Sequence, residues 1–286
     1  MQIPTVKFKA GNSIPLLGLG TWQLTGKKCI ETIKIALEIG YTHIDTAEIY
    51  GNQKEIREAI KDFPREKLFL TSKAWIKNLE FEKAIKACKK ALAELGTNYL
   101  DLYLIHWPNK KIPIENTLKA FAELQKKGLA RSIGVSNFTI PHLEEALPKA
   151  QELGIEIANN QCEFHPLLYQ KKLLDYCKNK EIIFTAYSPL GRGGILKNPV
   201  IRNIAEKYKK TPAQICLKWV LQKGAVAIPK ASSQLHLQEN LPVFNWQLSG
   251  QDEKAIDLLN KNQRIIAPFF AEFEGSKGSF LGNFYK

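Results

Sequence analysis

The sequence predicts an α/β protein built as a (β/α)8 barrel, also called a TIM barrel. Short apolar runs rich in β-branched residues alternate eight times with amphipathic helical patterns over about 240 residues. Polar side chains gather where the predicted strands end, which is where barrel enzymes place their chemistry. No linker, internal repeat or low-complexity segment divides the chain, so we expect residues 1–286 to form one domain. A doubly wound sheet is the alternative arrangement of the same elements.

The elements follow one another in a regular order. A small hairpin, about residues 5–16, is expected first, because two short apolar runs flank the turn residues Ala10-Gly11-Asn12. The predicted strands cover about 17–20, 43–47, 68–73, 99–106, 131–135, 155–159, 182–187 and 225–228. The predicted helices cover about 29–37, 53–60, 81–95, 114–127, 141–153 and 171–179, followed by two helical runs between 195 and 224.

Two helix starts carry local signals. Thr211 followed by Pro212 is the pattern of an N-cap and a first helical residue. Asn52, after the break at Gly51, is expected to cap the helix over 53–60. The tail from about 264 to 286 is irregular and rich in aromatic side chains, so we expect it to pack over one end of the barrel. These aromatic residues are Phe269, Phe270, Phe273, Phe280, Phe284 and Tyr285.

Composition excludes several functional classes. The chain is 44% hydrophobic and 24% charged, and no apolar run approaches the roughly 20 residues of a membrane span. Its first residues lack the basic start and apolar core of a secretory signal, so a cytoplasmic location is expected. The net charge is +13, but only six of the 41 basic residues are arginine and the lysines are spread along most helices. Solvated helix faces are therefore favoured over a nucleic-acid surface.

The five cysteines show no C-x-x-C pair and no metal-ligand spacing, so reduced core thiols are expected. Three histidines near strand ends, His43, His106 and His165, raise the alternative of a barrel metallohydrolase. The absence of an H-x-H pair and of a carboxylate cluster argues against any metal site. We therefore predict no metal.

Four ionisable side chains lie where neighbouring predicted strands end. Asp45 and Tyr50 follow the second strand, Lys73 ends the third, and His106 ends the fourth. A buried lysine needs a counter-charge, and Asp45 can supply it. A buried ammonium near a phenol favours the phenolate and lowers the tyrosine pKa from about 10, so Tyr50 can give a proton at neutral pH. Each residue alone also fits a structural role, such as an ion pair or a capped strand end, but their coincidence at one rim favours catalysis.

Eight motifs of the chain, in order, resemble those of the aldo-keto reductase family. They are Gly18-Leu-Gly20-Thr21-Trp22, His43-Ile-Asp45-Thr-Ala-Glu-Ile-Tyr50-Gly51, Thr71-Ser-Lys73, Leu104-Ile-His106-Trp107-Pro108, Gly134-Val-Ser136-Asn137-Phe138, Asn160-Gln161-Cys-Glu-Phe-His165-Pro166, Ala186-Tyr187-Ser188-Pro189-Leu190-Gly191, and Ile228-Pro229-Lys230-Ala-Ser-Ser with Glu239-Asn240. The family's fold is a (β/α)8 barrel with an amino-terminal hairpin, which agrees with the periodicity. The resemblance is to compact prokaryotic members, such as aldose, aldehyde and diketogluconate reductases.

The resemblance implies an NAD(P)H-dependent oxidoreductase that reduces aldehydes and ketones to alcohols, reversibly. It implies a catalytic tetrad of Tyr50 as general acid, Asp45 and Lys73 as the groups that tune it, and His106 as the group that orients the carbonyl. It also implies a substrate pocket formed with the tail by Trp22, Ile49, Trp75, His106 and Trp107. The alternative is a catalytically silent regulatory subunit that binds nicotinamide nucleotide on the same barrel.

The implied cofactor is NADP(H), with NAD(H) as a second choice. By resemblance Tyr187 stacks on the nicotinamide, and Ser136, Asn137 and Gln161 bind its carboxamide. The remaining implied cofactor residues are Thr21, Trp22, Ser188, Leu190, Gly191, Lys230, Ser232, Ser233, His236, Glu239 and Asn240. His236 stands where many NADPH-specific members have arginine, so a weakened preference for NADPH is expected. The expected partner is a small carbonyl substrate, with neither nucleic acid nor membrane, and the short loops resemble members that are monomers.

Overall fold

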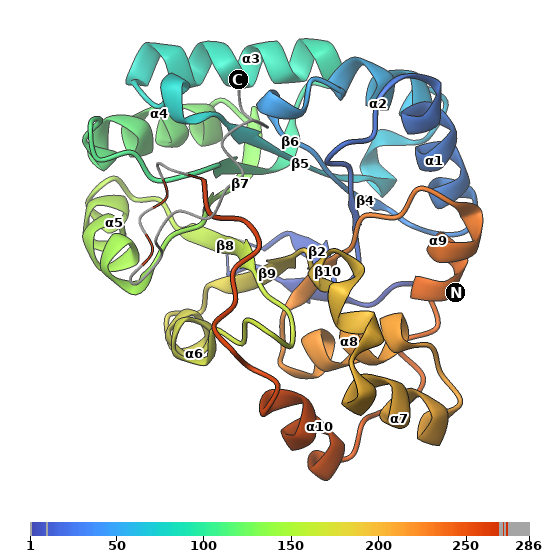
Figure 1. Ribbon diagram of the computed structural model, residues 1–286. Coiled ribbons are helices and arrows are strands. Elements are labelled where there is room, and N and C mark those ends of the chain that lie inside the picture. Colours follow the sequence, from blue (N-terminus) through green and yellow to red (C-terminus); the bar gives the residue numbers. More distant parts are fainter. Residues whose placement is uncertain (1, 10, 269–270, 272, 274–286) are drawn as a thin grey trace.

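A sheet of eight parallel strands curls into a barrel in the computed structural model, which describes residues 2–9, 11–268, 271 and 273 (Figure 1). Neighbouring strands in the sheet are also neighbours in sequence. The barrel closes where the amide of Gly18 donates to the carbonyl of Ala227 at 2.9 Å and the amide of Ala227 donates to the carbonyl of Leu16 at 2.9 Å. The predicted (β/α)8 barrel is therefore confirmed over the doubly wound sheet.

The elements alternate as predicted, with helices around the outside of the barrel. The parallel strands are β3 (Leu19–Gly20), β4 (His43–Asp45), β5 (Phe69–Ala74), β6 (Leu100–Ile105), β7 (Ala130–Ser136), β8 (Ile157–Glu163), β9 (Ile183–Tyr187) and β10 (Val226–Ile228). The α-helices are α1 (Gly26–Glu38), α2 (Gln53–Ile60), α3 (Phe81–Leu95), α4 (Ile114–Lys126), α5 (Ile140–Glu152), α6 (Lys171–Asn179), α7 (Pro199–Tyr208), α8 (Pro212–Gln222), α9 (Gln234–Asn240) and α10 (Gly250–Asp257). Short 3-10 turns cover Glu48–Tyr50, Arg65–Lys67, Ile76–Asn78 and Gly191–Lys197.

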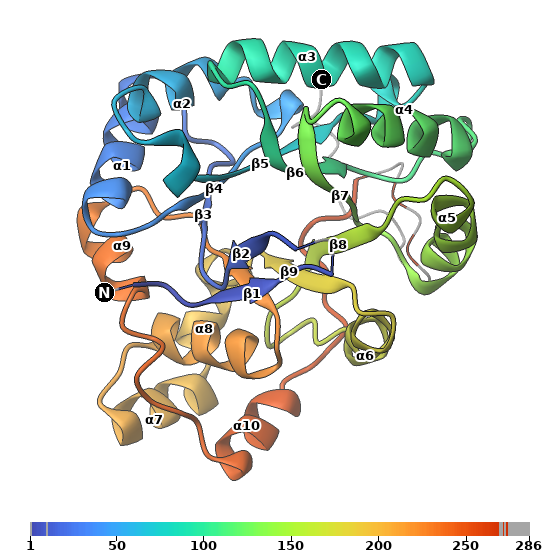
Figure 2. The ribbon, with the colours of Figure 1, turned by 180° about the vertical axis from the view of Figure 1, so that it is seen from behind.

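The predicted hairpin covers the amino end of the barrel. Strands β1 (Thr5–Lys7) and β2 (Ser13–Pro15) pair antiparallel and lie across that end, as the view from behind shows (Figure 2). Phe8 and Ile14 are buried there against Phe69 and Leu102. Because the hairpin occupies this end, the cavity of the barrel lies at the opposite, carboxyl end.

Helical periodicity accounts for the outer core. Helix α3 buries Ala84, Cys88, Leu92 and Leu95, which recur at intervals of three or four residues and so share one face. The α8 start is also confirmed, because the Thr211 hydroxyl accepts from the amide of Gln214 in a capping box. All five cysteines are buried free thiols, as expected.

Two local predictions were wrong. Strand β8 does not end at residue 159, because its pairing with β9 continues to Glu163, and Gln161 therefore lies inside the strand. Asn160 and Gln161 also lie inside β8, where Asn160 Nδ2 donates to the carbonyl of Phe138 at 3.0 Å and Gln161 Nε2 donates to Asp45 at 2.7 Å. Asn52 does not cap α2 with its side chain. Its amide instead donates to the carbonyls of Thr21 (2.9 Å) and Leu24 (3.0 Å), which ties two loops together.

The first part of the tail lies at the carboxyl end of the barrel, as predicted. Ile266 is buried there, and the Phe273 ring lies 5.8 Å from the Trp107 ring. The other tail aromatics, Phe269, Phe270, Phe280, Phe284 and Tyr285, lie outside the described residues. Among the helices that the structure describes, none combines the length and the apolar character needed to cross a membrane.

Candidate active site

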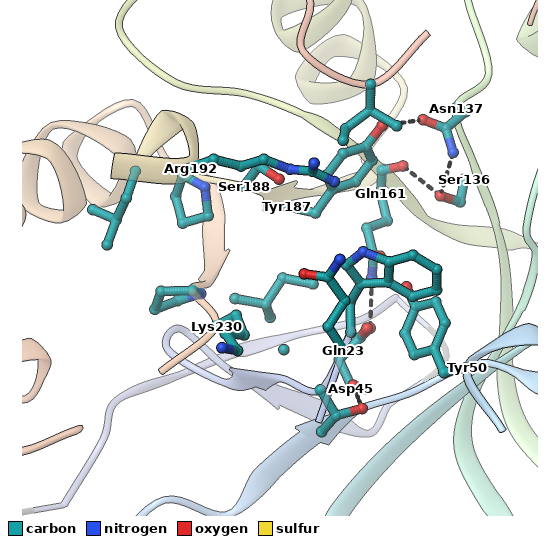
Figure 3. A pocket seen from close by; sticks show the side chains of 18 of the residues that line it. Gln23, Asp45, Tyr50, Ser136, Asn137, Gln161, Tyr187, Ser188, Arg192 and Lys230 are labelled. Atoms are coloured by element: carbon teal, nitrogen blue, oxygen red, sulfur yellow. Dashed lines mark hydrogen bonds between the residues drawn. The ribbon is translucent and has the colours of Figure 1, made fainter. Parts of the chain in front are cut away.

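A cavity of about 430 Å³ opens at the carboxyl end of the barrel (Figure 3). Its wall is built from strand ends and the loops that follow them, so residues distant in sequence meet there. Predicted site residues in the wall are Thr21, Trp22, Asp45, Tyr50, His106, Trp107, Ser136, Asn137, Gln161, Tyr187, Ser188, Leu190 and Lys230. The structure thus brings most of the predicted site together.

A buried ion pair lies at the base of this cavity. The Lys73 ammonium donates to Asp45 Oδ1 at 2.5 Å and to the carbonyl of Thr46 at 2.9 Å, and its side chain is fully enclosed. The second carboxylate oxygen of Asp45 accepts from Gln161 Nε2 at 2.7 Å. Strands β4 and β5 pair directly with Asp45 opposite Thr71, so Lys73 lies two residues further along β5, on the same face of the sheet and within reach of Asp45. The pair is therefore a product of barrel register.

Burial decides the ionisation of this group. Loss of water lowers the pKa of Lys73 and raises the pKa of Asp45, and the contact between the two charges opposes both shifts. Burial, reinforced by the nearby Lys73 charge, lowers the pKa of His106 well below its ordinary value. His106 is therefore a neutral imidazole at pH 7, and its ring can both donate and accept a hydrogen bond.

Tyr50 stands between these ionisable groups. It lies in the 3-10 turn after β4, and Gly51 ends that turn in the left-handed region, with φ at 67°. The Lys73 ammonium is 5.1 Å from the centre of the Tyr50 ring. The rings of His106 and Trp22 lie 5.7 Å and 4.8 Å away, both edge to face. The phenol thus sits beside a buried cation and a neutral histidine.

Amide and hydroxyl groups line the next part of the wall. The Ser136 hydroxyl donates to the carbonyl of Gln161 at 2.8 Å, and Asn137 Nδ2 donates to the carbonyl of His106 at 3.0 Å. The Tyr187 hydroxyl donates to Asn137 Oδ1 at 2.8 Å (Figure 3). These bonds fix the Tyr187 ring and the polar groups beside it, so this wall is organised before any ligand binds.

The glycine-rich loop after β9 forms the far side of the cavity. Gly191 and Gly193 have φ values of 53° and 86°, a conformation that glycine adopts without strain. Arg192 between them also has a positive φ, and it lines the cavity opposite Tyr50 (Figure 3). The sequence analysis did not single out Arg192, although it lies in the glycine-rich loop that the family resemblance implies for cofactor binding. Gly191 itself is buried beneath the loop and is absent from the lining.

The last predicted cofactor segment extends from β10 into α9. Lys230 lines the cavity, and its ammonium lies 3.3 Å from the Ser232 hydroxyl. The Ser233 hydroxyl caps α9 by accepting from the amide of His236 at 3.3 Å. His236 is exposed on that helix, whereas Asn240 is buried. Of the cofactor residues predicted in this segment, which also include Glu239, the one that lines the described cavity is Lys230.

Aromatic and aliphatic side chains form the remaining wall. Trp75 and Trp107 are buried in one cluster with Ile266 of the tail, and Ile49 packs against it. The Trp75 ring meets the His106 ring at 5.2 Å. Trp107 and Ile266 line the cavity directly, whereas Ile49 and Trp75 stand behind that surface. Other lining residues that the sequence analysis did not assign are Gly20, Gln23, Pro189, Gly193, Ile228, Pro229 and Ile266.

The two other histidines near strand ends, His43 and His165, make structural contacts. His43 contacts Thr71 at 3.1 Å, and His165 lies 2.9 Å from the Glu163 carboxylate, away from the cavity wall. No group of three or more metal-ligating side chains occurs among the residues that the structure covers.

Comparison with known proteins agrees with this architecture. The model of the aldo/keto reductase family matches residues 16–261. This chain belongs to the aldo/keto reductase family. It is 44% identical over 264 residues to the glyoxal reductase of Bacillus subtilis strain 168, covering 91% of this chain and 94% of that relative. It is 42% identical over 261 residues to the methylglyoxal reductase DkgB of Escherichia coli O157:H7, covering 90% and 97%.

Solved structures give the same result. The aldose reductase of Schistosoma japonicum superposes with a TM-score of 0.89 at 34% identity, over 98% of this chain and 99% of that one. An aldo/keto reductase from Brucella melitensis superposes with a TM-score of 0.85 at 40% identity, over 90% and 100%. The resemblance proposed from the motifs is therefore confirmed, and the protein is an oxidoreductase of this family.

Proposed function

We propose that the protein reduces aldehydes and ketones to alcohols, with Tyr50 as the general acid. The observation that carries this proposal is the position of the Tyr50 ring, 5.1 Å from the enclosed Lys73 ammonium and at the wall of the cavity. A phenol in that position has both access to a substrate and a charge that stabilises its deprotonated form. Membership of a family whose relatives include glyoxal and methylglyoxal reductases supports the same reaction class.

Each residue of the tetrad has a separate role in the proposed reaction. Tyr50 gives its proton to the carbonyl oxygen, and Lys73 stabilises the phenolate that remains. Asp45 holds the ammonium in place at 2.5 Å and balances its charge. Neutral His106 donates from a ring nitrogen to the same carbonyl oxygen, which orients the carbonyl toward Tyr50. These contacts stabilise the negative charge that develops on oxygen.

The cavity suits a reduced nicotinamide dinucleotide, which the family generally uses as NADP(H). When bound, this cofactor supplies the hydride that reaches the carbonyl carbon. The cavity wall holds the Tyr187 ring, several amides and the cations Arg192 and Lys230, groups that fit a nicotinamide and phosphates respectively (Figure 3). We assign the nicotinamide end to Thr21, Trp22, Ser136, Asn137, Gln161 and Tyr187, the pyrophosphate to Ser188, Leu190 and Gly191, and the adenosine to Lys230, Ser232, Ser233, His236, Glu239 and Asn240.

We further propose that the protein accepts both NADPH and NADH. His236 is exposed and offers an imidazole in place of the permanently charged guanidinium with which an arginine would pair a ribose phosphate, while Lys230 still supplies one cation. The expected ratio of catalytic efficiencies for NADPH over NADH lies below about a thousandfold, or roughly 4 kcal/mol. His236→Arg should raise that ratio by about tenfold. A wild-type ratio above the limit would contradict dual use.

Tyr50→Phe tests the proposed function. Reduced-nicotinamide absorbance is followed with aromatic aldehydes, aldoses, glyoxal and methylglyoxal, and loss of general acid catalysis should lower kcat by about 10²–10⁴. NADPH binding, measured by fluorescence titration, should be unchanged. Tyr176→Phe removes the same hydroxyl from α6, outside the cavity wall, and serves as the matched control. If wild type binds NADPH and reduces no carbonyl, a regulatory nucleotide-binding role replaces this proposal.

A further inference from the structure

A buried carboxylate at the end of β8 holds the start of the tail. Glu163 is fully enclosed, and its Oε1 accepts from the amide of Ile265 at 2.8 Å and from His165 Nε2 at 2.9 Å. Its Oε2 accepts from the amide of Ile266 at 2.9 Å. We call the contact of this carboxylate with the two tail amides the tail clamp. Burial of a carboxylate charge is costly unless hydrogen-bond donors compensate for the lost water. Hydrogen bonds to a charged acceptor are also stronger than bonds between neutral groups, so the bonds to Glu163 should be strong.

Further contacts beside the tail clamp fix the same stretch of chain. The carbonyl of Leu167 accepts from the amides of Lys261 and Gln263 at 3.1 Å and 3.0 Å. Gln170 accepts from Arg264 Nη2 at 2.7 Å and donates to the main chain at the end of β8. These groups keep partial access to water, which lowers the cost of losing their bonds. The clamp is the part of this seam that is both charged and buried.

The clamped residues form a wall of the cavity. Ile266 is 7% exposed, lines the cavity, and is buried in the same cluster as Trp75 and Trp107. Glu163 stands two residues after Gln161, which bonds Asp45 at 2.7 Å. One strand thus supports both the ion pair below the cavity and the tail beside it, although Glu163 is absent from the lining. Its effect on a substrate must pass through Ile266.

We propose that Glu163 is a positioning residue that sets the substrate range by holding Ile266 against the cavity. This inference rests on the proposed function, because it concerns the carbonyl pocket of the same site. Substrates large enough to reach Ile266 and Trp107 depend on the clamp, whereas small dicarbonyls that occupy only the space around Tyr50 and His106 do not.

Glu163→Gln tests the clamp with little change of shape. The glutamine side chain keeps one acceptor oxygen, but its NH2 group replaces the other. One of the two hydrogen bonds of the clamp is lost, and there the NH2 group faces the backbone N–H of a tail residue, so that two donors oppose each other. The KM for 4-nitrobenzaldehyde should rise by about tenfold, the KM for methylglyoxal by less than about threefold, and kcat should change little. Amide hydrogen exchange at Ile265 and Ile266 should accelerate, while NADPH affinity stays constant.

Asp101→Asn is the matched control. Asp101 is also a buried carboxylate that accepts from a backbone amide, that of Leu70 at 2.9 Å, but it lies at the amino end of the barrel. The control should leave both KM values unchanged, so a general loss of stability cannot imitate the clamp. If Glu163→Gln does not fold, Glu163→Asp, which keeps the charge on a shorter side chain, is measured in the same way.

A double-mutant cycle identifies the route of the effect. Ile266→Ala should raise the KM for 4-nitrobenzaldehyde, and the addition of Glu163→Gln should raise it by less than about twofold more, because both act through one contact. Additive effects would overturn the inference, as would an unchanged KM in Glu163→Gln. Inactivity of the wild type would instead defeat the proposed function, so the two failures are distinguishable.

Discussion

The two ends of the barrel use buried charge in different ways. At the carboxyl end, Lys73 and Asp45 are 0% and 2% exposed, and both lie beneath a cavity. At the amino end, Asp101 is 5% exposed, but its partner Arg65 reaches it from the surface and remains 22% exposed. One pair is closed off from water on both sides. The other keeps one member in contact with solvent.

The amino end shows the features of a structural support. The Arg65 and Arg131 guanidinium groups each lie 3.8 Å from the centre of the Tyr99 ring, and both bond Asp101. Asn12 in the hairpin turn reaches the same region through a bond to the carbonyl of Asp101. These contacts connect the hairpin, loops and strands. They stabilise the barrel that the carboxyl end uses.

The different exposure of the buried charges at the two ends separates residues that serve stability from residues that serve catalysis. A charge that is satisfied from the surface serves packing, and its loss is expressed in the free energy of unfolding alone. A charge enclosed beneath a cavity is costly, and its retention is explained by what it does to the neighbouring Tyr50. Substitutions at the two ends should therefore give different pairs of effects.

Lys73→Met should have the largest effect. It leaves the Asp45 carboxylate buried without its cation, which should lower the free energy of unfolding by about 3–5 kcal/mol. It also removes the charge that favours the Tyr50 phenolate, so kcat should fall by at least about 10². Urea unfolding and steady-state kinetics measure the two losses.

The double variant Asp45→Asn/Lys73→Met sharpens this result. With both charges gone, most of the lost stability should return, because the remaining amide can still accept from Gln161. Activity should not return. Recovery of activity together with stability would show that Lys73 acts on the fold and not on Tyr50.

Asp101→Asn should have an intermediate effect and only on stability. The loss of one charged acceptor should cost about 1–3 kcal/mol, since Arg65 can turn to water. The value of kcat/KM should stay within about twofold of wild type, because no atom of this cluster reaches the cavity. A drop in kcat at unchanged KM would contradict the conclusion that the Asp101 cluster affects stability and not catalysis.

The sequence predicted the carboxyl end well for a physical reason. Polar residues that close apolar strands are rare, and parallel pairing brings such positions together, so the sequence predicts that Asp45, Tyr50, Lys73 and His106 meet at one end of the barrel. The barrel was predicted from a short apolar strand pattern followed by an amphipathic helix pattern, a pair that occurs eight times along the chain. Both are short-range patterns whose consequence is fixed by the topology of a closed sheet.

Other features depend on contacts that no local pattern encodes. The role of Glu163 requires the tail to return to β8 across about a hundred residues, and Ile266 joins the wall only through that return. Arg192 lines the cavity because a positive φ redirects the loop. Asn52 bonds two loop carbonyls in preference to its own helix. For Glu163 and Asn52, a partner distant in the sequence decides the outcome.

The smallest predicted effect concerns histidine titration at the amino end. His43 begins β4, where its ring packs on Phe69, and burial followed by the Lys73 charge lowers its pKa to about 3. Its ordinary value is 6.5, so between these limits the unfolded chain binds more protons. Stability is therefore fully present above pH 6.5 and should fall as the pH falls through this window.

His43→Leu tests this linkage. The slope of unfolding free energy against pH between 5 and 6 should be smaller than in wild type by up to about 1.4 kcal/mol per pH unit. Phe69→Leu, a neighbouring core change without a titrating group, should lower stability equally at each pH. The pH profile of kcat should remain that of wild type, because His43 faces Thr71 and Phe69 and lies outside the cavity wall. Parallel stability curves for wild type and His43→Leu would show that this histidine titrates alike in the folded and unfolded chain.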